Sequence, residues 1–173
     1  GAVMSVRILV ICGVFNQALI GELWPILLAV ASVQAIIGAL LIGSGTRHTH
    51  AALIWKNPFD LPSALRFALF IGLILLLSTL AARQFGPQAL MTVSAFAGLA
   101  DVDAITLSLA RMSEPNTEIT LLANGVLIAT TANTVMKSLL ALVTGGGPTG
   151  ARVALVSAAA FVTGAAVFLL IRV

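Results

Sequence analysis

The sequence predicts an all-α membrane protein that forms one domain, residues 1–173, with six membrane-spanning helices. Of its 173 residues, 60% are hydrophobic and only 9% are charged, and the mean hydropathy is +1.11. A soluble domain carries about 25% charged residues. Six spans of about 20 residues each use most of the chain, so too little length remains for a second folded domain.

Apolar runs separated by Gly, Pro, Asn or charged residues define the six expected segments. Residues 21–25 contain a glutamate, an interfacial tryptophan and a proline, which we expect to close the first segment. A polar linker follows the second segment at residues 43–57, after which Asp60 and Pro62 suit the start of the third helix. The expected segments are residues 6–20, 26–42, 60–82, 88–112, 117–144 and 149–172.

The distribution of Lys and Arg between the loops predicts the orientation of the chain in the membrane. With six spans, one side holds more basic residues than the other, and we therefore expect both termini in the cytoplasm. The richer side has Arg7, Arg47, Lys56, Arg66, Arg111 and Arg172, and the other side has Arg83 and Arg152.

Several functional classes are excluded by composition and motifs. The nine Lys and Arg residues are scattered singly between apolar runs, which argues against nucleic-acid binding despite a net charge of +3. The single Cys12 allows neither an intrachain disulfide nor a cysteine-based metal cluster. No H-E-x-x-H or G-x-S-x-G motif occurs. We expect no enzymatic activity, and no cofactor other than a bound cation.

Two carboxylates, Asp101 and Asp103, lie near the middle of the fourth segment. At 1.5 Å per residue, Asp101 is roughly 15 to 20 Å from either end of this helix, and a charge so deep costs at least about 2.5 to 3.5 kcal/mol. Residues two apart on an ideal helix point about 200° away from one another. Either each aspartate faces a different side of an intact helix, or the helix breaks after Gly98 and both face one cavity.

We predict the broken helix, with the interruption near residues 98–103. Two carboxylates together with free backbone carbonyls suit a hard cation such as Mg²⁺, Ca²⁺ or Na⁺, or a proton relay. The alternative is structural: one aspartate forms a salt bridge, and the other caps a half-helix without any role in transport.

The fifth segment has a polar face that is too wide to contact lipid, and it must face the protein interior or a water-filled path. Lys137 is deep enough in this segment to need a partner, and Asp101 or Asp103 is the nearest by depth. The pair is either structural or a gate that closes the acidic site when it is empty. On an ideal helix this face spans about 160° and consists of Thr130, Thr131, Asn133, Thr134, Lys137 and Ser138.

Similar proline-containing starts of the third and sixth helices point to a 3+3 inverted repeat, with halves at residues 3–85 and 86–173. Inverted repeats place transporter sites near the bilayer midplane, between the halves. Asn16 and Gln17, deep in the first segment, are then the counterpart of the aspartate pair, although interhelical hydrogen bonding explains them equally well.

Two further features concern partners and metals. Small residues at four-residue spacing, as in Ala35 with Ala39 and Ala160 with Gly164, suit close helix packing within one chain or between two chains, and we expect a homodimer in the lipid bilayer. His48 and His50 in the polar linker have a spacing that can bind metal in an extended chain. The alternative, which we favour, is that both are solvated loop residues.

Three motifs together resemble a known family. Asn57-Pro58-Phe59, the run GLADVDAIT at residues 98–106 and the run NTVMK at residues 133–137 resemble the uncharacterised C-terminal membrane domain of MgtC/SapB-like bacterial proteins. The resemblance implies a bacterial inner-membrane protein in which an MgtC-like membrane module precedes this domain. MgtC-like proteins are associated with Mg²⁺ limitation and acid stress, and the resemblance implies no established transport activity. The family's motif residues correspond to Asp101, Asp103, Asn133 and Lys137.

The leading hypothesis from the sequence is an ion transporter or channel, selective for a cation. Asp101 and Asp103 would bind the ion or carry protons, Lys137 would be the counter-charge, and Thr130, Asn133 and Thr134 would complete the site. The alternative is a regulatory or interaction domain that transports nothing and whose buried charges fix the fold.

Overall fold

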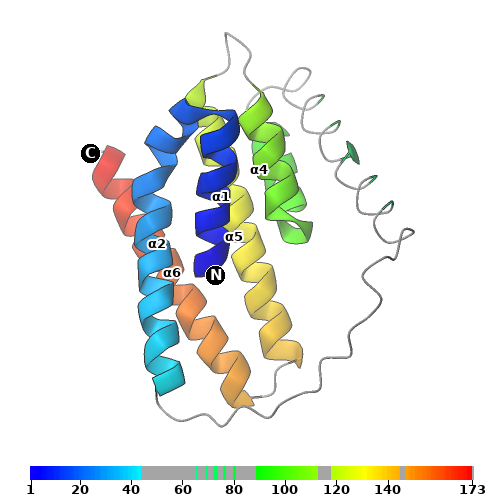
Figure 1. Ribbon diagram of the computed structural model, residues 1–173. Helices are drawn as coiled ribbons and strands as arrows, with labels where there is room; N and C mark the ends of the chain where they lie inside the picture. The colour runs from blue at the N-terminus through cyan, green and yellow to red at the C-terminus, as the bar shows by residue number, and fades with distance from the viewer. Residues whose placement is uncertain are drawn as a thin grey trace.

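The chain is α-helical wherever its structure is described. The computed structural model describes residues 1–43, 89–112, 118–144 and 147–172, together with single positions at 65, 69, 72, 73, 76 and 80. This confirms the predicted all-α class. The helices are α1 (Ala2–Phe15), α2 (Gln17–Gly43), an unlabelled helix (Ala89–Ala100), α4 (Val102–Arg111), α5 (Ile119–Thr144) and α6 (Gly147–Arg172) (Figure 1).

Three of these helices are long and apolar enough to cross a membrane: Gln17–Leu41, Ile119–Val143 and Gly150–Ile171. The protein is therefore a membrane protein. The predicted third segment, residues 60–82, lies outside the described residues except for the single positions. The predicted half-repeats, residues 3–85 and 86–173, cannot be compared, because most of the third segment lies outside the described residues.

The first helical boundary lies at Asn16, not at residues 21–25. Asn16 has extended backbone (φ −154°, ψ 95°), and its N–H donates to Cys12 O at 2.7 Å, which ends α1. Its side-chain Oδ1 accepts a hydrogen bond from Leu19 N at 3.3 Å, so the same residue also caps α2. The helix continues through Pro25. Glu22, Trp24 and Pro25 therefore lie within the first turns of α2, and the expectation that they close a helix is wrong.

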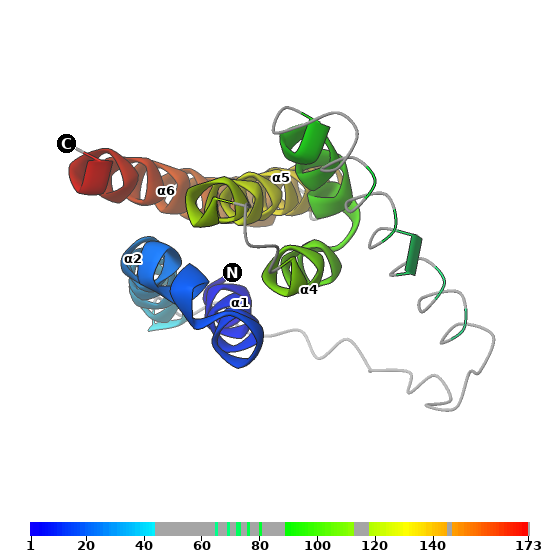
Figure 2. The same ribbon diagram turned by 90° about the horizontal axis from the view of Figure 1, so that it is seen from above.

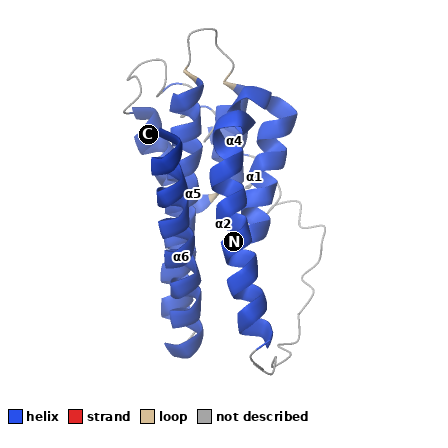
Figure 3. Cartoon of the chain, turned by 90° about the vertical axis from the view of Figure 1, so that its left-hand side faces the viewer, coloured by secondary structure: helices blue, strands red, loops and turns tan. Residues whose placement is uncertain are grey.

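The helices form two adjacent rows, which are clearest from above (Figure 2). Helix α2 packs against α1 and α6, while α5 packs against α6 and α4, and α4 also contacts α1. In the side view of Figure 3, α2, α5 and α6 are the long helices of the bundle. The buried core lies where α1, α4 and the helix Ala89–Ala100 meet the first halves of α2 and α5. Its fully buried side chains include Ile8, Cys12, Leu19, Leu23, Leu90, Ile105, Leu109, Leu122 and Val126.

A second helical boundary lies at Asp101. Its backbone is extended (φ −154°, ψ 113°), and α4 begins directly after it. The Asp101 N–H donates to Ala97 O at 2.8 Å, which completes the last turn of the preceding helix. The predicted interruption near residues 98–103 is confirmed.

Replacing Asn16 by alanine should destabilise the turn between α1 and α2. The substitution removes the side-chain acceptor for Leu19 N, and the loss of such a cap costs about 1 kcal/mol. We expect Asn16→Ala to unfold at lower temperature than the parent protein in detergent, whereas Asn16→Ser, which keeps a capping oxygen, should unfold near the parent temperature. Equal melting temperatures for the alanine and serine variants would contradict the capping role.

Candidate functional site

The chain reverses its direction at Asp101 and forms a helical hairpin against α5. Ser94, seven positions before Asp101, and Leu109, eight positions after it, lie against the same residue of α5, Gly125. A Cβ atom on Gly125 would be 3.0 Å from Ser94 Oγ and 2.9 Å from Leu109 Cδ1. Because positions on either side of Asp101 reach one glycine, the two helices fold back on each other.

The tip of this hairpin lies near the middle of α5. Asn133 Nδ2 donates a hydrogen bond of 2.9 Å to the carbonyl oxygen of Gly98, and Asn133 is the fifteenth of the 26 residues of α5. The tip therefore lies near the middle of a helix that is long enough to cross a membrane. Irregular backbone within the hydrocarbon region of a membrane is found where it is buried in protein or lines a cavity.

Gly98 allows the hairpin to approach α5 closely. A Cβ atom at this position would overlap the backbone of Ala129. The sequence indicated Gly98 as the point where the helix breaks, but the break is three residues later, at Asp101. The glycine is required by packing between two backbones and not by an unusual backbone angle.

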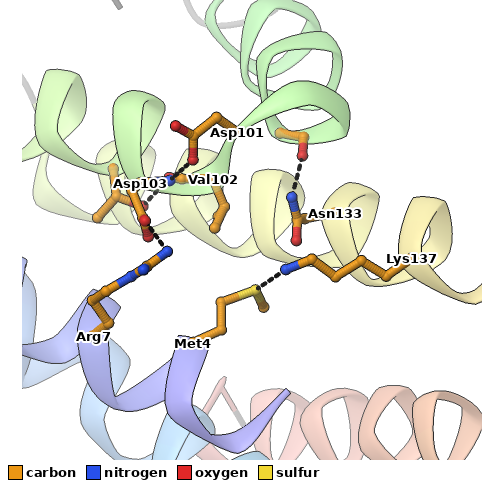
Figure 4. Close-up of polar contacts among 9 residues, drawn as sticks. Met4, Arg7, Asp101, Val102, Asp103, Asn133 and Lys137 are labelled. Atoms are coloured by element: carbon orange, nitrogen blue, oxygen red, sulfur yellow. Dashed lines mark hydrogen bonds and ion pairs between the residues drawn. The ribbon is translucent and has the colours of Figure 1, made fainter. Parts of the chain in front are cut away.

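The two aspartates have different partners. Asp101 caps α4, since its Oδ1 accepts a hydrogen bond from Asp103 N at 3.0 Å. Asp103 forms an ion pair through its Oδ2 with Arg7 of α1 (Figure 4). The other oxygen of Asp103, Oδ1, is buried and has no hydrogen-bond partner among the described residues. Asp103 is therefore both held in place and still able to accept a ligand.

Arg7 is the residue of the site that the sequence did not reveal. The sequence counted Arg7 only among the basic residues on the side of the N-terminus, and the structure brings it beside the hairpin tip, against Asp103. Its side chain is 59% exposed, compared with 25% for Asp103. An arginine near the start of an apolar run is typical of a membrane interface, so only the spatial arrangement of α1 and α4 could identify it.

Lys137 does not pair with an aspartate in the described part of the chain. Its Nζ lies 3.4 Å from Met4 Sδ, and a thioether is a weak acceptor. The amide oxygen of Asn133 is on the side that faces Lys137 (Figure 4), and this oxygen is buried without a hydrogen-bond partner. We refer to Arg7, Asp101, Asp103, Asn133 and Lys137 as the mid-depth cluster; its formal charges sum to zero.

The hydroxyl groups of α5 do not join this cluster. Each donates to the carbonyl oxygen four residues earlier, at 2.7 Å for Thr130 and 2.8 Å for Thr134, and at 2.9 Å for Thr131 and 2.8 Å for Ser138. Their polarity is satisfied within the helix, so this part of the polar face can border apolar groups. Thr130 and Thr134 line a crevice toward α6, and they are not brought to the aspartates.

Asn16 and Gln17 lie at the other end of α4 from the aspartates. The guanidinium carbon of Arg111, the last residue of α4, is 4.7 Å from the ring centroid of Phe15, the neighbour of Asn16. Asn16 and Gln17, the predicted counterpart of the aspartate pair, are therefore not close to Asp101 and Asp103. His48 and His50 are outside the described residues.

A metal bound at Asp101 and Asp103 would need other ligands in addition. Among the described residues, no group of three or more His, Cys, Asp or Glu side chains is close enough to hold a metal ion. Backbone carbonyls, an amide oxygen or water would have to supply the remaining oxygen ligands, as they commonly do for hard cations.

The chain belongs to the family described as "Domain of unknown function (DUF4010)", whose model matches residues 1–145. The match includes the whole mid-depth cluster. An "Uncharacterized protein" from Aquifex aeolicus (strain VF5) is 29% identical over 146 residues, which cover 83% of this chain and 64% of the relative. The chain thus spans 64% of the length of that relative. No solved structure matches the chain. The resemblance to MgtC/SapB-like proteins stays a prediction.

A side chain at Gly98 should separate the hairpin from α5. In Gly98→Val the new side chain would overlap the Ala129 backbone, and overpacking of this kind costs about 1 to 3 kcal/mol. Gly21→Ala is the matched control, because nothing lies within 4 Å of a Cβ atom there. We expect a lower melting temperature for Gly98→Val and no loss for Gly21→Ala. Equal stability of both variants would contradict the close approach.

A double-mutant cycle should identify Arg7 as the partner of Asp103. Arg7→Met leaves the Asp103 carboxylate without its counter-charge, which we expect to cost about 1 to 3 kcal/mol, between the values for exposed and buried pairs. Adding Asp103→Asn should recover part of that loss in thermal unfolding. Lys137→Met serves as the comparison and should show no such coupling to Asp103→Asn. Coupling to Lys137 in place of Arg7 would refute this assignment.

Proposed function

We propose that this member of the DUF4010 family is a membrane transporter or channel for a cation, with Asp103 as the central ligand or proton carrier. The observation that supports it best is the hairpin whose tip brings two carboxylates to the middle of a membrane-spanning helix. Ionisable residues at such depth are costly, and they commonly mark ion or proton pathways. Interrupted helices near the bilayer midplane are a recurrent way of forming these sites.

Arg7 acts in this proposal as a tethered substitute for the ion. While it is paired with Asp103, the pair is formally neutral, and an incoming cation gains little from it. For an ion to replace Arg7 at Asp103, the guanidinium group must move away from the carboxylate. The Arg7 side chain is more than half exposed, so it has room to move. The unpartnered Asp103 Oδ1 offers the first contact to the incoming cation or proton.

The other members of the mid-depth cluster have supporting roles in the proposal. Asp101 fixes the start of α4 through its cap to Asp103 N. Asn133 holds the tip against α5 through Gly98 and keeps an unpartnered amide oxygen. Lys137 supplies the second positive charge that balances the aspartates. Oxygen ligands of this type favour a hard cation, with Mg²⁺ or proton-coupled exchange as the candidates.

A second candidate function is a regulatory or interaction domain that carries no ion. The contacts that favour it are the cap made by Asp101 and the ion pair made by Asp103, because together they give each carboxylate a structural partner. In this alternative the charges only fix the hairpin, and no flux occurs.

The assembly that we propose is a homodimer in a bacterial inner membrane, with both termini in the cytoplasm and an MgtC-like module as a partner. Ala35 and Ala39 on α2 are exposed and available for contact with a second chain. Gly164, in contrast, is used within the chain, since a Cβ atom there would be 3.2 Å from Val30 Cγ2.

Flux measurements in proteoliposomes should separate the two functions. We expect the parent protein to carry one of Mg²⁺, Na⁺, K⁺ or H⁺ down an imposed gradient, and Asp103→Asn to abolish this flux while the protein remains folded. Glu118→Gln is the matched control, because it removes an exposed carboxylate at the start of α5 and should leave the flux unchanged. Absence of flux for every ion, or full flux in folded Asp103→Asn, would contradict the transport function.

A further inference from the structure

A long crevice on the far side of α5 from the mid-depth cluster is formed mainly by α2, α5 and α6, and Met91 of the helix Ala89–Ala100 also lines it. Its volume is about 940 Å³, and its walls include Ile26 and Val30 of α2, Val135 and Leu139 of α5, and Phe161 and Phe168 of α6. Near the α5–α6 junction the two helices touch, since a Cβ atom on Gly150 would be 2.7 Å from Ala141 O. From that end the two helices diverge (Figure 1), and the crevice lies between them.

The chemistry of the wall is that of a hydrocarbon site. The hydroxyls that α5 contributes, those of Thr130, Thr131, Thr134 and Ser138, all donate to backbone carbonyls of their own helix. They present methyl and methylene groups to the crevice and leave their donors satisfied. Asn124 of α5 and Ser157 of α6 are the other polar side chains of the lining. An ion or a polar solute would therefore find few partners here, and the crevice is distinct from the proposed ion site.

The surroundings and dimensions of the crevice indicate what fills it. All three walls belong to helices that are able to cross the membrane, and Phe161 at the rim is 60% exposed, so the crevice opens toward the hydrocarbon layer. The lining of α5 extends from Asn124 to Leu139, about 22 Å at 1.5 Å per residue. This exceeds one leaflet of the hydrocarbon core, which is about 15 Å.

The size of the crevice is that of a ligand site. Its volume of about 940 Å³ falls within the range of sites for single bound molecules, about 300 to 1,000 Å³. We infer that the crevice is a binding site for the acyl chains of a membrane phospholipid. This inference does not depend on the proposed transport function, although α5 separates the two sites and would connect them mechanically.

Lipid retention tests this assignment. The protein is reconstituted in vesicles of phosphatidylethanolamine and phosphatidylglycerol, extracted in detergent and examined by native mass spectrometry. We expect the parent protein to retain phospholipid. Ala165→Phe, which fills the crevice, should retain about tenfold less, the equivalent of 1.4 kcal/mol in binding. Ala158→Phe fills the same crevice from another turn of α6 and should have the same effect if Ala165→Phe folds poorly.

Ala166→Phe is the matched control, because Ala166 is exposed on α6 and does not line the crevice. It should retain lipid as the parent does. With a phospholipid that carries a photoreactive group on its acyl chain, cross-links should concentrate on Val135 and Phe161 and be fewer on Leu155 and Val162 of the outer face of α6. Equal retention by the variants at 165 and 166, or even cross-linking around α6, would overturn the assignment. A lipid-free dimer that Ala165→Phe dissociates would overturn it as well, because a second copy would then occupy the crevice.

Discussion

The ion pair between Arg7 and Asp103 is the contact on which the rest of the site depends. It joins α1 to the hairpin tip, and an uncompensated charge near the middle of a membrane span costs at least about 2.5 to 3.5 kcal/mol. Asp101 can remain beside it because its carboxylate caps α4. Because each carboxylate has a structural partner through one of its oxygens, the hairpin can keep its tip within the bundle and pack its glycine against the backbone of α5.

Helix α1 makes polar contacts with two different helices of the mid-depth cluster, α4 and α5. Arg7 contacts Asp103 on α4, and Met4, about one turn earlier, contacts Lys137 on α5. A cation that displaces Arg7 would therefore remove the polar contact between α1 and α4, while the contact of Met4 with Lys137 and the apolar packing of α1 against α4 remain. In the proposed exchange, ion binding would thus act on α1 through one of its two polar contacts.

The sequence predicted the helix break near Asp101. It did not predict that Arg7 pairs with Asp103, nor that the first helical boundary lies at Asn16. The cost of burying Asp101 and Asp103 could be estimated from their distance to the helix ends, and this cost favoured an interruption. Arg7 was counted only as a basic residue on the N-terminal side, because pairing between distant helices leaves no trace in a hydropathy pattern. Asn16 was missed because a single capping residue can end one helix and start the next. Glu22, Trp24 and Pro25 were misleading because such residues occur near a membrane interface within a helix as well as at its end.

The depth of the hairpin tip in the bilayer tests this account most directly. A spin label at Ala100→Cys, an exposed position next to Asp101, can be introduced in a Cys12→Ser background, and its depth follows from collisions with oxygen and with a water-soluble nickel complex. A label at Glu118→Cys marks the membrane surface. We predict that the label at position 100 lies near the bilayer centre, roughly 15 Å below the interface. A label at the headgroup level, at the same depth as position 118, would contradict the mid-depth cluster and the transport site that depends on it.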